Sequence, residues 1–241
     1  MQIVLNMVLE EPCILPLSYH HIVQSAIYEL TSENDENECR EHKGGVHYNT
    51  RVYRSFTFGL LDGKYSIINK QISFKEMLSM EIRSMDEHIV QLIMDNAIKN
   101  GIRLGKNLIP NIKVERQDYK VLDNDIVISM NSPICVYETD PESKHTHFYT
   151  PDETVFYKAI SNNFTRKYTA FFGQVPESEI TLERVQVKAR DKYVTKYKGF
   201  ILSGWKGIYR LIGKPEYLDF LYQTGLGAKN AQGFGMFDVV R

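Results

Sequence analysis

The chain has 241 residues, of which 43% are apolar, enough to bury one large core or two small ones of about 100–120 residues each. Its formal net charge of −1 argues against a uniformly basic nucleic-acid binder, so such a function would need a local concentration of positive charge. Three widely separated cysteines indicate neither a disulfide framework nor a zinc cluster. Without a signal-peptide pattern or an apolar run approaching ~20 residues, the sequence predicts a soluble, cytoplasmic protein with no membrane partner.

The first two predicted elements are a strand and a helix. Residues 2–9 place apolar side chains at every second position, which predicts a strand with one buried face. Residues 17–31 carry apolar side chains at helical spacing, which predicts a helix with one apolar stripe. Tyr28 lies almost opposite the middle of that stripe, on the same face as His21 and Gln24. This aromatic side chain therefore needs a role other than packing in the core beneath the helix.

A polar, acid-rich connection at residues 32–41 leads into a loop at residues 42–51, and surface loops of this kind can carry chemistry. Residues 54–61 follow as a predicted strand, with large apolar side chains on one face and small ones on the other. The dipeptide Asp-Gly at residues 62–63 is a hairpin signal. It predicts that residues 64–72 form the antiparallel partner of the preceding strand.

A second helix is predicted over residues 86–100, ending at Gly101, and further strands over residues 109–114 and 119–129. The resulting order, β-α-β-β-α-β, is that of a ferredoxin-like unit. We therefore expect residues 1–130 to form an N-terminal ferredoxin-like domain.

The second half repeats this order of elements. Residues 150–153, Thr-Pro-Asp-Glu, are a strong helix start with a threonine cap, proline at the first position and a capping-box glutamate. The other predicted elements are a strand at residues 134–138, a strand pair at 180–189 and 199–209, a short helix after Pro215 and a last strand at 234–240. The predicted fold is α+β: tandem ferredoxin-like (RRM-like) domains, each an antiparallel sheet with two helices, with residues 131–241 as the second domain.

Positive charge is concentrated between residues 184 and 214, where nine basic residues face one acid, Asp191. Aromatic residues are interleaved with them, and charge with exposed aromatic rings is the combination that single-stranded RNA recognition uses. The alternative is a pair of solvated strand faces. The predicted RNA-binding residues of this stretch are Lys188, Arg190, Lys192, Lys196 and Lys198, with Tyr193, Tyr197, Trp205 and Tyr209 between the basic positions.

A glycine-rich loop precedes the last strand. Four glycines, Gly225, Gly227, Gly233 and Gly235, lie within eleven residues around Lys229. Glycine permits positive φ and a close approach of phosphate to main-chain N–H groups, and the lysine adds charge, so the loop suits a polyanion. On spacing alone a tight hairpin is the alternative, whereas a dinucleotide loop is excluded because no βαβ unit follows.

The segment GLGAKNAQGFGMFDVV resembles the C-terminal glycine-rich loop of the CRISPR-associated repeat-processing endoribonucleases, members of the repeat-associated RNA-binding (RAMP) superfamily. All four glycines match the pattern of that family, roughly G-x-G-x(5)-G-[FL]-G followed by a strand. The resemblance implies RNA binding by the glycines and Lys229, and it implies the tandem ferredoxin-like fold.

A second segment, HKGGVHYNTRVYRSFTFGLL, is similar to the family's stretch in which a histidine stands fourteen residues before the F-T-[FY]-[SG] strand. Carried over position by position, the general acid/base histidine falls on His42 and the active-site lysine on Arg54. The helix-borne tyrosine found in part of the family falls on Tyr28. His47 is an alternative to His42, because only the register of the match separates the two.

These residue types support cleavage of RNA by its own 2′-hydroxyl, without a metal ion or cofactor. A group of near-neutral pKa moves protons, and a cation stabilises the charged transition state. Arginine at position 54 keeps the positive charge but is a poor proton donor, so we expect it to stabilise charge. The predicted products carry 2′,3′-cyclic phosphate and 5′-hydroxyl ends.

We therefore predict a metal-independent endoribonuclease that cleaves CRISPR repeat RNA in a precursor transcript to give guide RNAs. The alternative is a catalytically inactive repeat-RNA-binding subunit of a CRISPR effector complex. No metal-ligand set stands out among the remaining histidines. The expected partners are repeat RNA and subunits of a CRISPR effector complex, and the sequence leaves open a monomer or a homodimer.

Overall fold

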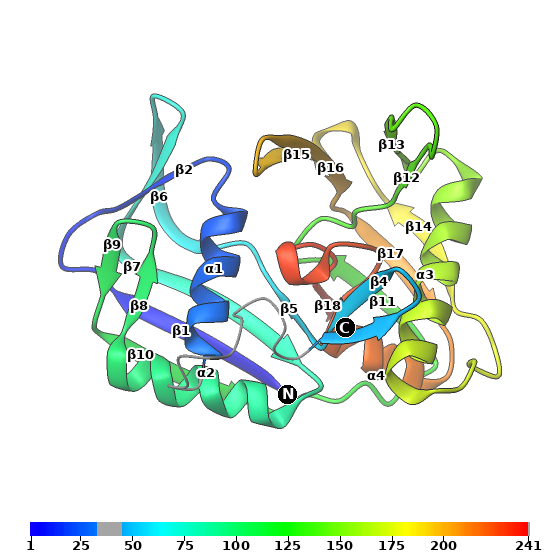
Figure 1. Ribbon diagram of the computed structural model, residues 1–241, viewed down its shortest axis with the longest axis horizontal. Coiled ribbons are helices and arrows are strands. Elements are labelled where there is room, and N and C mark those ends of the chain that lie inside the picture. The colour runs from blue at the N-terminus through cyan, green and yellow to red at the C-terminus, as the bar shows by residue number, and fades with distance from the viewer. Residues whose placement is uncertain (33–44, 241) are drawn as a thin grey trace.

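The computed structural model describes residues 1–32 and 45–240, and it places two antiparallel sheets side by side (Figure 1). Four strands of the first sheet lie in the order β10-β1-β7-β5, while β2 and β6 extend the N-terminal part of β7. The strands of this sheet are β1 (Gln2–Val8), β2 (Cys13–Pro16), β5 (Phe56–Phe58), β6 (Asp62–Ile68), β7 (Gln71–Ser84) and β10 (Ile112–Gln117).

The second sheet has the order β14-β17-β11-β18. When the strands are numbered within each half, both sheets have the same order. The fourth strand lies beside the first, the first beside the third, and the third beside the second. The prediction of tandem ferredoxin-like units is therefore confirmed. The strands of this sheet are β11 (Asp125–Met130), β14 (Thr181–Gln186), β17 (Ile208–Ile212) and β18 (Phe237–Val240).

Within the described ranges, each half contributes two helices that pack on its own sheet. The helices are α1 (His20–Leu30) and α2 (Glu87–Asn100) in the first half, and α3 (Thr154–Phe172) and α4 (Pro215–Thr224) in the second. The prediction for α2 is accurate because both ends are marked locally: Asp86 caps its first N–H groups and Gly101 ends it at φ 70°. Among the described residues, no helix has the length and apolar character needed to cross a membrane.

In the described part of the chain, four further hairpins and two short 3₁₀ turns extend from the two sheets. The β3–β4 hairpin belongs to the first half of the chain but packs against α3 of the second (Figure 1). The hairpins are β3 (Gly45–Tyr48) with β4 (Arg51–Arg54), β8 (Ile102–Leu104) with β9 (Asn107–Ile109), β12 (Tyr137–Thr139) with β13 (Thr146–Phe148), and β15 (Lys192–Tyr197) with β16 (Phe200–Trp205). The 3₁₀ turns are η1 (Ala189–Asp191) and η2 (Asn230–Gln232).

The hairpin predicted at residues 62–63 is wrong. β6 begins at these residues, and Gly63 lies at an irregularity in its pairing with β7. The turn that joins the two strands is Asn69-Lys70, where both residues have positive φ (50° and 61°). Two residues of positive φ match the right-handed twist of a hairpin, and asparagine tolerates that conformation better than most residues.

The last strand predicted for the first unit also belongs elsewhere. β11 pairs with β17 and β18 of the second sheet, because Ile126, Ile128 and Met130 bury their side chains in the second core. The first unit therefore ends with β10. We accordingly propose a domain boundary between β10 and β11 in place of one after residue 130.

Two further boundaries in the second half differ from the prediction. The Glu153 carboxylate accepts a hydrogen bond from the Thr150 N–H (2.6 Å), as in a capping box, but the helix itself begins at Thr154. The predicted strand at 199–209 is two strands: β16 pairs with β15, and β17 pairs with β14. Gly207, at φ 120°, separates them.

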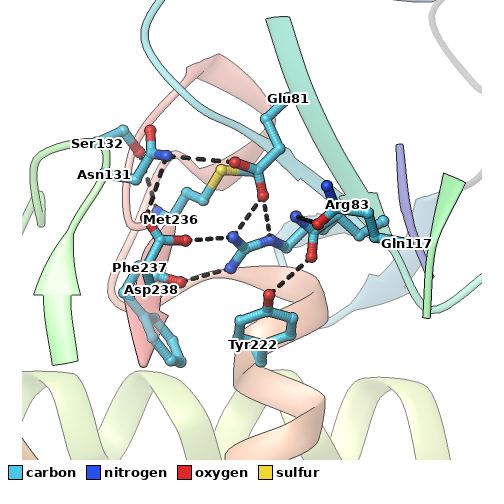
Figure 2. A network of polar contacts seen from close by, with 10 residues as sticks. Glu81, Arg83, Gln117, Asn131, Ser132, Tyr222, Met236, Phe237 and Asp238 are labelled. Carbon is cyan, nitrogen blue, oxygen red and sulfur yellow. Dashed lines mark hydrogen bonds and ion pairs between the residues drawn. The ribbon is translucent and has the colours of Figure 1, made fainter. Parts of the chain in front are cut away.

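A buried arginine joins the two sheets. Arg83 of β7 is fully buried, and its guanidinium donates to Glu81 (2.6 Å) within the first half and to the Phe237 carbonyl and Asp238 on β18 (Figure 2). The same group lies 3.8 Å above the ring of Tyr222 on α4. This network fixes the first sheet against the second, because a buried guanidinium without these partners would be costly.

Candidate functional site

The main candidate site is a cleft of about 930 Å³ between the two halves. Its wall comes from α1 and β4 of the first half, and from β12, α3 and the glycine-rich loop (residues 225–235) of the second. Among the described residues that line it, six are lysine or arginine and one, Glu138, is acidic. The basic residues are Arg51, Arg54, Lys158, Arg166, Lys167 and Lys229. A concave surface with this balance attracts a polyanion.

Tyr28 and Arg54 meet at this cleft, as the resemblance implied for an active site. The guanidinium carbon of Arg54, at the end of β4, lies 5.6 Å from the ring centre of Tyr28 on α1. The Tyr28 ring also packs edge-on against Phe56. A Cβ on Gly45 would lie 2.6 Å from Arg54 Nη1, so the missing side chain at Gly45 leaves room for the guanidinium.

The two candidate histidines have different outcomes. His42 lies outside the described residues. His47 is exposed on β3 opposite Val52, and it is not among the described residues that line the cleft. The structure therefore brings together two of the sequence-predicted side chains, Tyr28 and Arg54, and does not add His47 to them.

The four glycines of the glycine-rich loop are buried and have φ between 67° and 84°. A Cβ on Gly235 would lie 2.0 Å from the Leu226 carbonyl oxygen, and one on Gly233 would lie 2.6 Å from the Phe58 ring. The glycines are thus required for the loop to fold onto the core. Gly227 lines the cleft, but direct RNA contact by the four glycines stays a prediction.

Two side chains hold this loop in shape. Asn230 Nδ2 donates to the carbonyl oxygens of Leu226 (2.9 Å) and Phe234 (3.0 Å). Lys167 Nζ donates to the Asn230 side-chain oxygen (3.1 Å) and to the carbonyl oxygens of Thr224 (3.3 Å) and Gly225. The carbonyl oxygens of Thr224 and Gly225, at the C-terminal end of α4, favour the ammonium form, whereas burial lowers the pKa of Lys167 to about 7.

Lys167 was not predicted from the sequence, although a signal exists. It follows Phe164 by three residues and Ile160 by seven, and therefore lies on the apolar stripe that these two residues mark along α3. A lysine on such a stripe requires acceptors inside the fold. Three other lining residues were also missed, namely Arg51 on β4 and Lys158 and Arg166 on the exposed face of α3.

Lys229, predicted from the sequence, lies at the tip of the glycine-rich loop and lines the cleft. Its backbone is left-handed (φ 64°), which turns the chain, and its ammonium group lies 4.8 Å from the ring centre of Tyr137. The lysine therefore presents its charge beside an aromatic ring on β12.

The predicted basic surface is exposed, but its aromatic residues are arranged differently. All five predicted RNA-binding residues of this stretch are exposed: Lys188, Arg190, Lys192, Lys196 and Lys198. Tyr193 and Tyr197 are half-buried and turn toward α1, and Tyr209 is in the second core. Trp205 is also only partly exposed and packs against the second core. The expectation of exposed rings between the basic residues is therefore wrong for all four. The exposed ring of this hairpin is Phe200, which is 76% exposed at its tip.

Part of the basic charge is also neutralised by carboxylates from other parts of the second half. Arg184 pairs with Asp152, Arg210 with Asp125 (2.6 Å), and Lys214 with Glu177. These acids lie outside the stretch from 184 to 214. Counting charges within that stretch alone therefore overestimates the net positive charge of the surface that it forms.

His20 links the first helix to the second half through both nitrogens of its ring. The buried ring donates from Nδ1 to the Gln232 carbonyl oxygen (2.8 Å) and accepts from the Tyr193 hydroxyl at Nε2 (2.8 Å). A carbonyl oxygen can only accept, so Nδ1 carries the proton of the neutral ring. Burial lowers the pKa of His20 below its ordinary value.

The unfolded chain protonates this ring near pH 6.5, so it binds more protons than the folded chain below that pH. Stability should fall as the pH drops from about 6.5 toward the folded pKa, by at most about 1.4 kcal/mol per pH unit. Urea unfolding at pH 7.5 and 5.5 measures this loss, which should shrink in His20→Gln and persist in His88→Gln, a change at an exposed site. An equal loss in the wild type and His20→Gln would contradict the assignment.

Within residues 1–32 and 45–240, no group of three or more His, Cys, Asp or Glu side chains could hold a metal ion. His147 pairs with Glu153 at 3.1 Å on the surface, and these two side chains are not part of such a group.

A family model described as CRISPR associated protein Cas6, C-terminal, matches residues 115–239. The fold defines the class of protein: tandem ferredoxin-like units with a glycine-rich loop before the last strand. More narrowly, the chain belongs to the Cas6 family. The CRISPR-associated endoribonuclease Cas6 1 of Methanocaldococcus jannaschii is 24% identical over 247 aligned residues, covering 98% of this chain and 91% of that relative.

Solved structures agree in fold. A structure described as an RAMP protein binding different RNA substrates aligns with a TM-score of 0.80 and 23% identity over 100% of both chains. A Cas6-related protein from Pyrococcus furiosus aligns with a TM-score of 0.80 and 22% identity, covering 100% of this chain and 98% of that chain.

Proposed function

We propose that this chain is an endoribonuclease that cleaves CRISPR repeat RNA in a precursor transcript to give guide RNAs. The observation that carries the proposal is the meeting of Tyr28 and Arg54 at a cationic cleft bounded by the glycine-rich loop. An RNA strand in this cleft would place a phosphate between cations of the two halves. The named activity of the Methanocaldococcus jannaschii relative supports the same reaction.

The proposed chemistry is attack of the RNA's 2′-hydroxyl on the adjacent phosphate, without a metal ion. His42 transfers a proton, the Arg54 guanidinium stabilises the negative charge of the transition state, and the Tyr28 hydroxyl donates a hydrogen bond at the reacting phosphate. Arginine suits this role because it stays protonated and its planar N–H groups match phosphate oxygens. The P–O5′ bond breaks, leaving a 2′,3′-cyclic phosphate and a 5′-hydroxyl.

Binding is divided between two surfaces. Inside the cleft, Lys229 of the glycine-rich loop and the basic face of α3 would hold the backbone near the reacting phosphate. Outside it, the exposed lysines of β15 and its turn would hold the rest of the repeat. In this arrangement the four buried glycines shape the loop, and Gly227 alone of the four lies in the wall of the cleft.

The decisive experiment is cleavage of the source organism's own repeat RNA by the full chain in EDTA, with the product ends identified. We expect cutting at one site within the repeat, with 2′,3′-cyclic phosphate and 5′-hydroxyl ends. A strict requirement for Mg²⁺ would contradict the proposed chemistry. RNA that binds tightly but stays uncut, with and without Mg²⁺, would favour a catalytically inactive RNA-binding subunit of a CRISPR effector complex.

A further inference from the structure

Helix α1 presents three polar side chains toward the second half of the chain. His20, Gln24 and Tyr28 follow one another at intervals of four residues, so they lie on one face of the helix, one turn apart. His20 contacts the glycine-rich loop and Tyr193, and Tyr28 contacts Arg54 at the cleft. Gln24, between them, is assigned no role by the chemistry proposed above.

Gln24 contacts three different elements through one amide group. Its Nε2 donates to the Ala231 carbonyl oxygen in the glycine-rich loop (2.6 Å) and to the hydroxyl oxygen of Tyr28 (3.3 Å). Its Oε1 accepts from the hydroxyl of Tyr197 on β15. The side chain is 9% exposed and lines the cleft.

These contacts fix the orientation of the amide. The Ala231 carbonyl oxygen can only accept, so the NH₂ group must face the loop and the oxygen must face Tyr197. The second N–H then points at Tyr28. Because the Tyr28 oxygen accepts from Gln24, its own O–H must donate in another direction, and the cleft lies beside it.

We propose that Gln24 is a positioning residue for RNA cleavage: it holds the Tyr28 hydroxyl as an acceptor, so that the Tyr28 O–H points at the reacting phosphate. This inference rests on the proposed function, because it assigns Gln24 a role through Tyr28. The glycine-rich loop and Tyr197 hold the same amide, so both contribute to the orientation of the Tyr28 hydroxyl.

The test is a double-mutant cycle in single-turnover cleavage of the repeat RNA. Gln24→Met keeps the length of the side chain but removes its donors and acceptor. At saturating RNA we expect cleavage about tenfold slower than wild type, with the half-saturating RNA concentration unchanged, the effect of one oriented hydrogen bond. In the Tyr28→Phe background, which lacks the hydroxyl, Gln24→Met should change the rate less than about twofold.

Two further variants complete the design. Gln91→Met changes an exposed glutamine on α2 and should cleave like the wild type. Tyr197→Phe removes the hydroxyl that contacts Gln24 Oε1, keeps the ring, and carries the test if Gln24→Met does not fold. It should slow cleavage in the wild-type background and not in the Tyr28→Phe background.

The outcomes separate this inference from the proposed function. Equal slowing by Gln24→Met with and without the Tyr28 hydroxyl would overturn the positioning role and leave the endoribonuclease intact. Unchanged cleavage in Tyr28→Phe would overturn the role of the hydroxyl and the inference together. A wild-type chain that binds repeat RNA without cutting it would overturn the proposed function first.

Discussion

Replacing His42 by alanine is expected to slow cleavage of repeat RNA about 10²–10⁴-fold while leaving its binding unchanged, the loss typical of a positioned acid or base. The matched control is His47→Ala, for which we expect a rate within about threefold of wild type. We expect little effect from His47→Ala because His47 is exposed on β3 and is not among the described residues that line the cleft.

The expectation for His42 rests on the family resemblance and on its place in the chain. It stands three residues before Gly45, and the main chain at Gly45 lies against the Arg54 guanidinium. Single-turnover rates with saturating enzyme, together with filter binding of uncut RNA, measure the two effects separately. Strong loss in His47→Ala with normal cutting in His42→Ala would reverse the assignment.

Replacing Arg54 by alanine is expected to slow cleavage of repeat RNA about 10²–10³-fold. This is the loss seen when an enzyme loses one preorganised hydrogen-bond donor to the negative charge of its transition state. Arg54→Lys keeps the positive charge, and the family pattern has lysine at the matching position, so we expect it to stay within about tenfold of wild type. The effect should fall on the rate at saturating RNA, because the stabilised charge exists only in the transition state.

Arg51 supplies the comparison for this prediction. It lies on the same hairpin and lines the same cleft, but it is exposed, and no catalytic role follows from the family pattern. Arg51→Ala should weaken RNA binding, with a reduced salt dependence, and leave the saturated rate near wild type. If Arg54→Ala behaved in the same way as Arg51→Ala, Arg54 would be a binding residue.

Local signals made much of the fold predictable. The limits of α2 follow from a capping aspartate and a terminal glycine, both of which act within one turn of the helix. The sheet that a given strand joins was harder to predict from the sequence. β11 has the apolar alternation of any half-buried strand, and only its partners, β17 and β18, which lie far along the chain, decide which sheet it joins.

The residues of the candidate site were likewise predictable only where a short segment of sequence marks them. Tyr28 and Arg54 were found through family patterns that stand within short segments. The roles of Lys167 and Arg166 depend on packing between distant elements, because Lys167 meets the end of α4 57 residues later. Arg166 becomes a cleft residue through the approach of the β3–β4 hairpin to α3.

The approach of the β3–β4 hairpin to α3 also shows how the two copies share the candidate site. Each ferredoxin-like copy has its own sheet, but Ala231 of the glycine-rich loop completes the core of the first copy. Here one copy supplies Tyr28 and Arg54, the other supplies Lys167 and Lys229, and neither contains a complete cleft. The cleft therefore belongs to the interface between the copies, and a chain that carried only one of them would lack half of its wall.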